Sequence, residues 1–230
     1  MRVAIIGTGY VGLVSGACFA AKGHSVTCVD IDQAKVDAIN DRRPPIHEAG
    51  LQDLLDQTVP GNLTATTDLA AAVRGADLTM IAVGTPFDGA TIDLTYIKAA
   101  ARQIGEVLAE KDDYHVVTVK STVVPGTTET VVLPILEEAS GKLAGRDFGV
   151  GMNPEFLKEG EAIADFMNPD RVVIGGIDLR STDRQAELYA GFPGVEILRT
   201  TPATAEMVKY TSNALLATLI SFSNEIGNTS

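Results

Sequence analysis

The sequence predicts an α/β fold of the Rossmann-like, doubly wound type, in which a mostly parallel sheet is followed by a long C-terminal helix. Three observations point to it: short apolar strands alternate with helical stretches, several strands are continuous apolar runs, and a glycine-rich turn follows the first strand. Strands that are apolar on both sides are expected where helices cover both faces of a parallel sheet. Strand–helix alternation is typical of such sheets.

The elements can be placed along the whole chain. Strands are expected at Val3–Ile6, Ser25–Val29, Leu63–Ala65, Thr79–Val83, Val116–Val119, Phe148–Met152, Val172–Ile174 and Val195–Leu198. Helices are expected at Val11–Lys22, Gln33–Asn40, Leu51–Gln57, Leu69–Arg74, Thr95–Glu110, Thr127–Ala139, Gly160–Asp165 and Thr182–Tyr189. With about 150 residues per domain as a guide, we expect residues 1–200 to form one domain and residues 201–230 to begin a connecting helix.

That last helix is predicted to be apolar on nearly every side. It starts near Pro202 and runs to about Gly227. Its apolar stripes are Met207, Tyr210, Ala214 and Ala217; Leu215, Leu219 and Phe222; and Leu216 and Ile220. Such a helix must be buried on most sides. We therefore expect it to form the core of a homodimer or to pack against a part of the protein beyond this chain.

Composition excludes some classes of partner. The chain has 18 Lys and Arg against 30 Asp and Glu, a net charge of −12, and it would repel the phosphates of nucleic acids. Its two cysteines are too few for a disulfide framework or a zinc site, and we expect no metal. Glycines interrupt the uncharged run Val3–Ala21, which argues against a signal or membrane segment. A soluble, cytoplasmic protein is expected.

The first candidate site is the turn Gly7-Thr8-Gly9-Tyr10-Val11-Gly12, between the first strand and the first helix. Gly7 permits the tight turn, Gly9 lets the backbone approach a pyrophosphate, and Gly12 allows close packing of helix on strand. Free N–H groups and the helix dipole favour an anion there. We expect this turn, including Tyr10 and Val11, to bind a dinucleotide; a glycine-rich turn without a ligand is the alternative.

Asp30 ends the second strand, 18 residues after Gly12, where a carboxylate accepts hydrogen bonds from an adenosine ribose. The same carboxylate would repel the 2′-phosphate of NADP, so NAD is the favoured cofactor. Lys35, at the start of the next helix, could reach the same ribose edge. A capping Asp and a solvated Lys are the alternatives.

Two polar loops follow later strands: Gly84-Thr85-Pro86 and Lys120-Ser121-Thr122. In an open α/β sheet, ligands bind beyond the carboxyl ends of the strands. The hydroxyls of Thr85, Ser121 and Thr122 are therefore candidates to contact a nicotinamide or a reacting water. Helix capping and turn formation are the alternative.

Paired side chains mark two further candidate sites. Glu155 and Glu159 would share one helical face if a helix has already begun there; one could act as a general base through water while the other anchors a ligand. Acids favoured by a helix N-terminus are the alternative. Lys209 and Asn213 lie four residues apart on the last helix and could polarise an oxygen during hydride transfer. A lysine that extends to solvent is the alternative.

Together these residues resemble the nucleotide-sugar 6-dehydrogenases, the family of UDP-glucose and GDP-mannose dehydrogenases. The matching residues are Gly7–Gly12 with Asp30, Gly84-Thr85-Pro86, Ser121-Thr122 with Pro125-Gly126, Asn153-Pro154-Glu155-Phe156-Leu157 with Glu159, and Glu206-Met207-Val208-Lys209 with Asn213 and Asn224-Glu225. The likeness runs across essentially the whole chain. It implies oxidation of C6 of a nucleotide sugar from alcohol through aldehyde to acid, with two NAD.

The resemblance also implies roles for single residues. Those near the cofactor are Asp30 and Lys35 at the adenosine ribose, and Gly84, Thr85, Pro86, Ser121, Thr122 and Glu159 towards the nicotinamide. Those in the chemistry are Thr122 and Glu155, for water and protons, Lys209 and Asn213, for an oxyanion, and also Glu159. Those that border the sugar are Glu155, Phe156, Leu157, Lys158 and Glu159, with Lys209 and Asn213.

In one respect the chain departs from the family. The second oxidation in the family passes through a thiohemiacetal and a thioester on a cysteine in a downstream Gly/Ser-rich segment, which this sequence does not contain. Cys18 and Cys28 are expected in the first helix and the second strand, as packing residues. The chain therefore resembles the NAD-binding domain and connecting helix without the nucleotide-sugar-binding domain, and we expect it to bind NAD without completing the oxidation.

Other classes and substrates stay open. A β-hydroxyacid dehydrogenase would share the glycine turn and a Lys-x-x-x-Asn helix, and a non-enzymatic module would bind NAD without sugar dependence. Within the favoured family, residues 143–151 and Glu225-Ile226-Gly227 resemble GDP-mannose enzymes, whereas Phe166–Arg171 resembles UDP-glucose enzymes. UDP-glucose is slightly favoured.

Overall fold

The computed structural model describes residues 1–87, 89 and 91–229. Its strands are β1 (Arg2–Ile6), β2 (Ser25–Val29), β3 (Leu63–Thr66), β4 (Leu78–Ile81), β5 (His115–Val119), β6 (Phe148–Met152), β7 (Arg171–Gly176) and β8 (Glu196–Thr200). Its α-helices are α1 (Tyr10–Ala21), α2 (Gln33–Asn40), α3 (Leu51–Thr58), α4 (Leu69–Gly75), α5 (Thr95–Ala109), α6 (Leu133–Ser140), α7 (Ala162–Met167), α8 (Leu179–Ala186) and α9 (Pro202–Thr229). All eight predicted strands are found in the described residues.

The strands form one sheet in the order β3-β2-β1-β4-β5-β6-β7-β8. All neighbours are parallel except β6 and β7, which pair antiparallel. The predicted mostly parallel, doubly wound fold is therefore confirmed. The chain winds outward from β1 towards β3 and then returns to place β4 on the other side of β1, and a crevice at such a point is where this architecture binds ligands.

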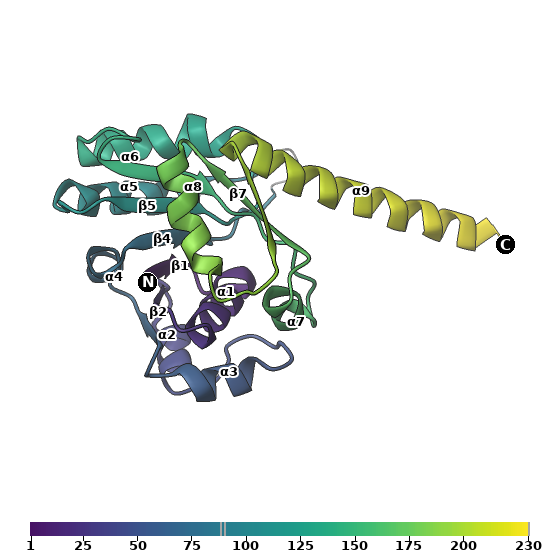
Figure 1. Cartoon of the computed structure of the whole chain (residues 1–230). Helices are drawn as coiled ribbons and strands as arrows, with labels where there is room; N and C mark the ends of the chain where they lie inside the picture. The colour runs from purple at the N-terminus through teal and green to yellow at the C-terminus, as the bar shows by residue number, and fades with distance from the viewer. Residues whose placement is uncertain (88, 90, 230) are drawn as a thin grey trace.

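Helices cover both faces of the sheet (Figure 1). On one face a core of buried side chains joins α1, α3 and α7 to the strands, with Phe19 at its centre. On the other face, the second core joins α4, α5 and α6, together with the start of α9, to the strands. Burial on both faces explains why the strands are continuous apolar runs.

In strand β6, large side chains alternate with glycines, and the packing of the sheet explains this pattern. Phe148, Val150 and Met152 belong to the core on the α5 and α6 side. A Cβ atom on Gly149 would lie 2.5 Å from the Ser181 hydroxyl oxygen, and one on Gly151 would lie 2.1 Å from the Gln185 amide nitrogen. The glycines therefore let α8 approach the sheet closely.

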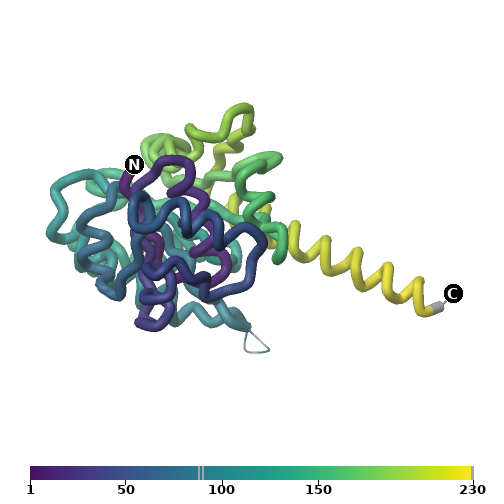
Figure 2. The backbone as a smooth tube through the Cα atoms, turned by 90° about the horizontal axis from the view of Figure 1, so that it is seen from below, coloured from purple at the N-terminus to yellow at the C-terminus, as the bar shows by residue number. Residues whose placement is uncertain are grey.

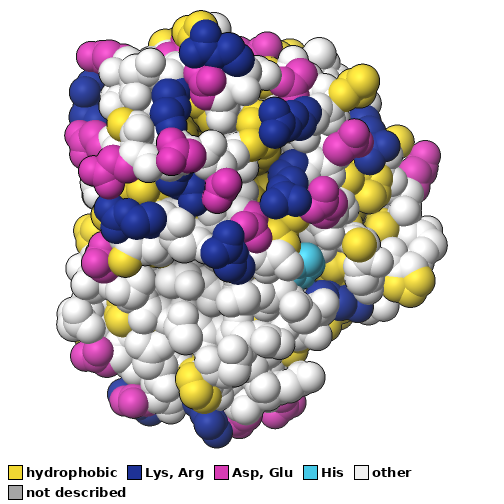
Figure 3. All heavy atoms as spheres, turned by 60° about the vertical axis from the view of Figure 1, so that its left-hand side comes forward, with side chains coloured by type: hydrophobic (Ala, Val, Ile, Leu, Met, Phe, Trp, Pro, Cys, Tyr) yellow, Lys and Arg dark blue, Asp and Glu magenta, His cyan; other side chains and the backbone are white. Residues whose placement is uncertain are grey.

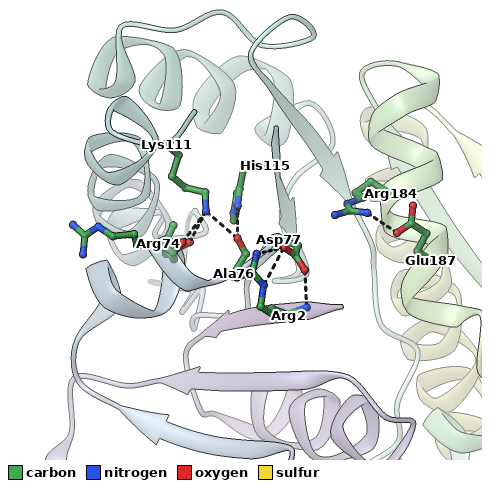
Figure 4. Close-up of polar contacts among 9 residues, drawn as sticks. Arg2, Arg74, Ala76, Asp77, Lys111, His115, Arg184 and Glu187 are labelled. Atoms are coloured by element: carbon green, nitrogen blue, oxygen red, sulfur yellow. Dashed lines mark hydrogen bonds and ion pairs between the residues drawn. The ribbon is translucent and has the colours of Figure 1, made fainter. Parts of the chain in front are cut away.

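A polar cluster closes the edge of the sheet opposite the glycine turn (Figure 4). The Asp77 carboxylate accepts hydrogen bonds from the backbone N–H of Arg2, at 2.9 Å, and from its guanidinium. The Lys111 ammonium donates to the Arg74 and Ala76 carbonyl oxygens at the end of α4. These contacts join the start of β1, the end of α4 and the end of α5, so the cluster is structural.

Helix α9 leaves the body of the molecule and extends far beyond it (Figures 1 and 2). Its first turns are packed, since Ala205, Glu206 and Lys209 are buried. From Asn213 to Asn228 every side chain is exposed, and the exposed residues include Leu215, Leu216, Leu219, Ile220, Phe222 and Ile226. One uninterrupted helix was predicted here, and it is confirmed.

Three predicted helices differ from those observed. The helix predicted at Thr127–Ala139 begins as a π-helix, Thr128–Val132, and becomes α-helical only at Leu133. The helix predicted at Thr182–Tyr189 starts at Leu179, because the Asp178 carboxylate caps it by accepting from the Ser181 N–H, and it ends in a 3-10 turn. The helix predicted at Gly160–Asp165 starts at Ala162, for a reason given below.

Charged side chains of both signs are interspersed on the face shown in Figure 3. Cys18 and Cys28 are both buried, as the packing role predicts. Among the described helices, none combines the length and hydropathy that a membrane crossing needs.

Candidate active site

The glycine turn has the geometry that its sequence predicts. Gly7 has φ +101°, in the left-handed region, and a Cβ there would lie 2.7 Å from the Ala82 carbonyl oxygen. A Cβ on Gly12 would lie 1.9 Å from the Gly7 carbonyl oxygen. A Cβ on Gly9 would meet no heavy atom within 4 Å. Gly7 and Gly12 are thus required by the fold, whereas Gly9 leaves open space above the turn.

The N-terminus of α1 is available to an anion. Gly9 is its N-cap residue, so no side chain caps the helix, and its first turn contains no acidic residue. The first N–H groups of a helix have no partner within the helix and carry the positive end of its dipole. This end of α1 therefore offers backbone donors to a phosphate group.

Asp30 lies beside the turn at the end of β2. Its Oδ2 accepts hydrogen bonds from the Thr8 N–H at 3.0 Å and the Thr8 hydroxyl at 2.5 Å. Its Oδ1 accepts from the Asp32 N–H at 3.0 Å, and the Lys35 Nζ lies 3.8 Å from Oδ2. Burial opposes the charge, but these hydrogen bonds outweigh it and lower the pKa of Asp30. The structure thus brings Asp30 and Lys35 together as a long, partly exposed ion pair.

Sequence reasoning missed the neighbour of Asp30. Ile31 is 94% exposed at this edge and presents an apolar side chain beside the carboxylate. Such a surface suits the flat face of an adenine base. A single exposed Ile within an acidic stretch carries no signal in the sequence.

The loops after β4 and β5 are tied to one another. The Thr85 hydroxyl donates to the Thr122 carbonyl oxygen at 2.8 Å, and the Ser121 hydroxyl donates to the Val83 carbonyl oxygen at 2.6 Å. Gly84 and Pro86 are exposed beside them. The hydroxyls of Thr85 and Ser121 therefore serve turn formation, which was the alternative interpretation of these residues. The Thr122 hydroxyl makes no hydrogen bond with the described residues, so it is available for a ligand or water.

A buried ion pair joins the last helix to the loop after β6. The Lys209 Nζ lies 2.7 Å from Glu155 Oε1, and the two side chains are only 7% and 11% exposed. Glu155 Oε2 also accepts the N–H of Leu157 at 2.7 Å. The Lys209 ammonium further lies 5.5 Å from the centre of the Phe156 ring. These contacts thus hold both charges of the pair in position at the carboxyl edge of the sheet.

The predicted shared helical face of Glu155 and Glu159 is wrong. Residues 153–161 form no helix, and Glu159 is exposed. The Leu157 N–H bonds the Glu155 carboxylate, and the N–H groups of Gly160 and Ala162 bond the buried carboxylate of Glu48. Because side-chain oxygens take these donors, the helical ladder begins only at Ala162.

The predicted common face of Lys209 and Asn213 is confirmed by the continuous helix, but the two side chains differ in environment. Lys209 is buried, whereas Asn213 is exposed one turn further along α9. Lys158 is exposed and its N–H bonds the Asp165 carboxylate at 3.0 Å. The structure therefore gathers Glu155, Phe156 and Lys209 tightly, with Asn213 and Lys158 at the margin.

A cavity of about 260 Å³ is lined by residues of this loop, including Glu155, Phe156 and Leu157, together with side chains from α7 and β7. Lys120 forms part of its wall, and its ammonium donates to Asn153 Oδ1 at 3.1 Å. Tyr189 donates to the same oxygen at 2.6 Å. Burial lowers the pKa of Lys120 to about 8. Sequence reasoning did not select Lys120; its signal was a charged residue at the end of a buried apolar strand.

Glu206 is a second residue that sequence reasoning did not place in the site. It is fully buried, and its carboxylate accepts from the Gly126 N–H at 2.5 Å, the Thr128 N–H at 2.8 Å and the Thr128 hydroxyl at 2.6 Å. It lies one turn before Lys209 and so fixes the start of α9 against the loop that carries Thr122. Burial raises its pKa, against the opposing effect of these hydrogen bonds.

A Rossmann-like sheet with an open glycine turn, a carboxylate at the end of β2 and a buried lysine at the carboxyl edge is typical of a nicotinamide-dinucleotide dehydrogenase domain. The comparison with protein families is specific: residues 1–193 match the UDP-glucose/GDP-mannose dehydrogenase family, NAD binding domain. The chain belongs to this family. The prediction of NAD as cofactor is thereby confirmed, and the family replaces the β-hydroxyacid dehydrogenase alternative.

Individual relatives agree with this assignment. The chain is 49% identical over 230 residues to a GDP-mannose 6-dehydrogenase of Pseudomonas syringae pv. tomato, covering 99% of the chain and 52% of the relative. It is 46% identical over 235 residues to a UDP-glucose 6-dehydrogenase of Haloferax volcanii, covering 99% and 54%. A ternary complex of GDP-mannose dehydrogenase from Pseudomonas aeruginosa superposes with a TM-score of 0.96 at 46% identity, covering 99% of this chain and 52% of that one. The chain thus spans about half the length of the curated relatives it matches.

Proposed function

We propose that this chain supplies the NAD-binding half of a nucleotide-sugar 6-dehydrogenase, which oxidises C6 of the sugar to the carboxylic acid. The observation that carries the proposal is the buried Lys209–Glu155 pair at 2.7 Å, at the same edge of the sheet as the glycine turn. A dinucleotide site alone fits many enzymes. A desolvated ammonium beside it also supplies a group for a reacting oxygen.

The residues present fit NAD. Open space above Gly9 and the uncapped N-terminus of α1 suit its pyrophosphate, and Asp30 with Lys35 suits the adenosine ribose. Gly84, Thr85, Pro86, Ser121 and Glu159 would lie towards the nicotinamide, as the resemblance implies. When bound, NAD accepts a hydride from the carbon that is oxidised.

The residues at the edge of the sheet would handle charge and protons. The Lys209 ammonium would stabilise negative charge on the sugar oxygen, since a positive group in a site with little water is most effective there. Asn213, on the same face of α9, would add an amide donor. Glu155, held by Lys209 and the Leu157 N–H, and the free Thr122 hydroxyl would position a water and accept its proton.

The substrate is proposed to be UDP-glucose or GDP-mannose. Relatives with each activity match the chain to nearly the same extent, at 46% and 49% identity. The slight preference for UDP-glucose stays a prediction from Phe166–Arg171. Phe156, Leu157 and Lys158 would border the sugar in either case.

We further propose that α9 pairs with a second copy of the chain. Its exposed apolar side chains, Leu215, Leu216, Leu219, Ile220, Phe222 and Ile226, continue for about three turns beyond the packed part of the helix. A helix with this surface is stable in water only when a partner covers it. The division into residues 1–200 and 201–230 stays a prediction, as does a cytoplasmic location.

Calorimetric titration tests the proposal. UDP-glucose and GDP-mannose are titrated into the chain at saturating NAD, and Lys209→Met is compared with Lys98→Met, which removes an exposed lysine of α5. The proposal is supported if one sugar nucleotide binds and if Lys209→Met weakens its binding about tenfold while Lys98→Met does not. The sugar nucleotide that binds is then the substrate. Equal sugar binding by the wild type and Lys209→Met would contradict the role of Lys209. A chain that binds NAD but neither sugar would show that the nucleotide-sugar site needs the half of the relatives that this chain does not span.

A further inference from the structure

Glu48 is a buried carboxylate in the loop between α2 and α3, and the proposed reaction does not use it. It is only 6% exposed. Its Oε2 accepts hydrogen bonds from the Tyr10 hydroxyl and from the Gly160 N–H at 2.9 Å. Its Oε1 accepts the Ala162 N–H at 2.9 Å. One carboxylate therefore contacts two segments that lie 150 residues apart in the sequence.

The first of these segments is the glycine turn. Tyr10 belongs to the turn and is the first residue of α1, so its backbone stands where the pyrophosphate of a dinucleotide would bind. Its hydroxyl accepts the Gly160 N–H at 3.0 Å and lies 3.2 Å from the Lys158 carbonyl oxygen. A change in the position of the turn is thus transmitted to both partners of the hydroxyl.

The second segment follows Glu155 and would border the nucleotide sugar. Residues 157–161 contain no regular helix or strand, so few backbone hydrogen bonds fix their course. Glu48 and Tyr10 supply the partners that this segment lacks. Without the carboxylate, the buried Ala162 N–H would lose its acceptor, and the Gly160 N–H would keep only the Tyr10 hydroxyl.

The charge on Glu48 is stable at neutral pH. Burial opposes it, but the hydrogen bonds from Tyr10, Gly160 and Ala162 outweigh burial and lower the pKa of the carboxyl. Burial in turn raises the pKa of the Tyr10 hydroxyl to about 12, so this group remains a donor. The connection is therefore a charge-assisted hydrogen bond, which is stronger than a neutral one.

We propose that Glu48 is a positioning residue that couples the two binding surfaces: a dinucleotide at the glycine turn orders residues 157–162 through Tyr10 and Glu48, and so prepares the border of the sugar site. This inference rests on the proposed function, because it takes the glycine turn as the cofactor site. It predicts a response to NAD at residues 160–162, beyond the contact proposed for Glu159, and it predicts that this response depends on Glu48.

Hydrogen–deuterium exchange of the chain with and without NAD tests the coupling. In the wild type, NAD should slow exchange at residues 10–13 and also, by at least about threefold, at residues 157–162. In Glu48→Gln, which keeps the shape of the side chain, NAD should still protect residues 10–13, while its effect at 157–162 should disappear. Asp53→Asn, an exposed acid on α3, is the matched control and should behave as the wild type.

A second variant covers the case in which Glu48→Gln does not fold. Tyr10→Phe removes only the hydroxyl and leaves the carboxylate its two backbone donors, and it should also abolish the NAD effect at residues 157–162. The inference would be overturned if NAD slowed exchange at residues 157–162 equally in both variants and in the wild type. It would also be overturned if NAD protected residues 10–13 of the wild type but had no effect at residues 157–162. Failure of NAD to bind at all would instead overturn the proposed function, and this inference with it.

Discussion

Lys209 on α9 and Glu155 in the loop after β6 form an ion pair of 2.7 Å in which both side chains are almost fully buried. The pair fixes the start of the last helix to the carboxyl edge of the sheet. Two opposite charges removed from water stabilise a fold little as a pair, but either one alone is costly to bury. The pair is therefore weak evidence of stabilisation, and its position supports the role proposed for Lys209.

Removal of one partner should therefore destabilise the domain. Lys209→Met leaves the Glu155 carboxylate without its counter-charge, and the free energy of unfolding should fall by about 2–4 kcal/mol. Glu155→Gln combined with Lys209→Met should recover a large part of this loss. Urea unfolding measures both, with Lys98→Met as the exposed control. Equal stability of Lys209→Met and the wild type would show that Glu155 is solvated, contrary to its 11% exposure.

Two glycines of the turn should respond differently to the same substitution. Gly12→Ala places a Cβ 1.9 Å from the Gly7 carbonyl oxygen, so it should lower the free energy of unfolding by about 2 kcal/mol or more. Gly9→Ala meets no atom of the protein within 4 Å and should change stability by less than about 0.5 kcal/mol. It should nevertheless weaken NAD binding at least about tenfold, because the methyl group occupies the space for the pyrophosphate. Unchanged NAD affinity of Gly9→Ala would place the cofactor elsewhere.

Buried His115 should make stability depend on pH. Its Nε2 lies 2.8 Å from the Thr79 hydroxyl. Its Nδ1 lies 3.2 Å from the Ala76 carbonyl oxygen (Figure 4). Burial lowers its pKa to about 3, whereas in the unfolded chain it is about 6.5. Below pH 6.5 the unfolded state therefore binds a proton that the folded state does not, and the free energy of unfolding falls as pH falls.

The size of this effect follows from linkage. One such proton gives a slope approaching about 1.4 kcal/mol per pH unit between pH 6 and pH 4. His115→Gln should reduce the measured slope by nearly that amount, although it also lowers stability at pH 7. His47→Gln, at an exposed histidine, should leave the slope unchanged. An unaltered slope in His115→Gln would mean that His115 is protonated in the folded protein.

The apolar surface of α9 predicts self-association. Sedimentation equilibrium of the chain should give a dimer, and Leu219→Glu should shift it towards the monomer at the same concentration. Leu219 is 53% exposed in the single chain, so this substitution should leave the stability of the sheet unchanged. A wild-type chain that sediments as a monomer would contradict pairing through α9.

The sheet could be predicted from the sequence because its central strands, such as β4, β5 and β6, are buried along their whole length and are therefore largely apolar runs. The edge strand β8 is largely exposed. The glycine turn could be predicted as well, since Gly7 and Gly12 meet local steric demands that other residues cannot. The error at Glu155 and Glu159 has a different origin. Spacing of four residues predicts a shared face only in a helix, and here Glu48, more than 100 residues away in sequence, takes the N–H groups that a helix would need.

The missed charged residues share one property. Glu48, Glu206 and Lys120 are buried charges whose partners lie in distant segments of the chain. In a chain with 30 acidic residues, nothing in the local sequence distinguishes a buried carboxylate from a solvated one. The resemblance to a family named Lys209 and Glu155 as site residues, but only the folded chain shows that they contact each other.

Calorimetric titration of the folded chain with NAD tests the central claim most directly. The account predicts saturable binding with one NAD per chain, weakened at least about tenfold by Gly9→Ala or Asp30→Ala, and much weaker binding of NADP because Asp30 repels its 2′-phosphate. A chain that is folded by circular dichroism and releases no heat with NAD, and that also shows no shift in melting temperature, would contradict it.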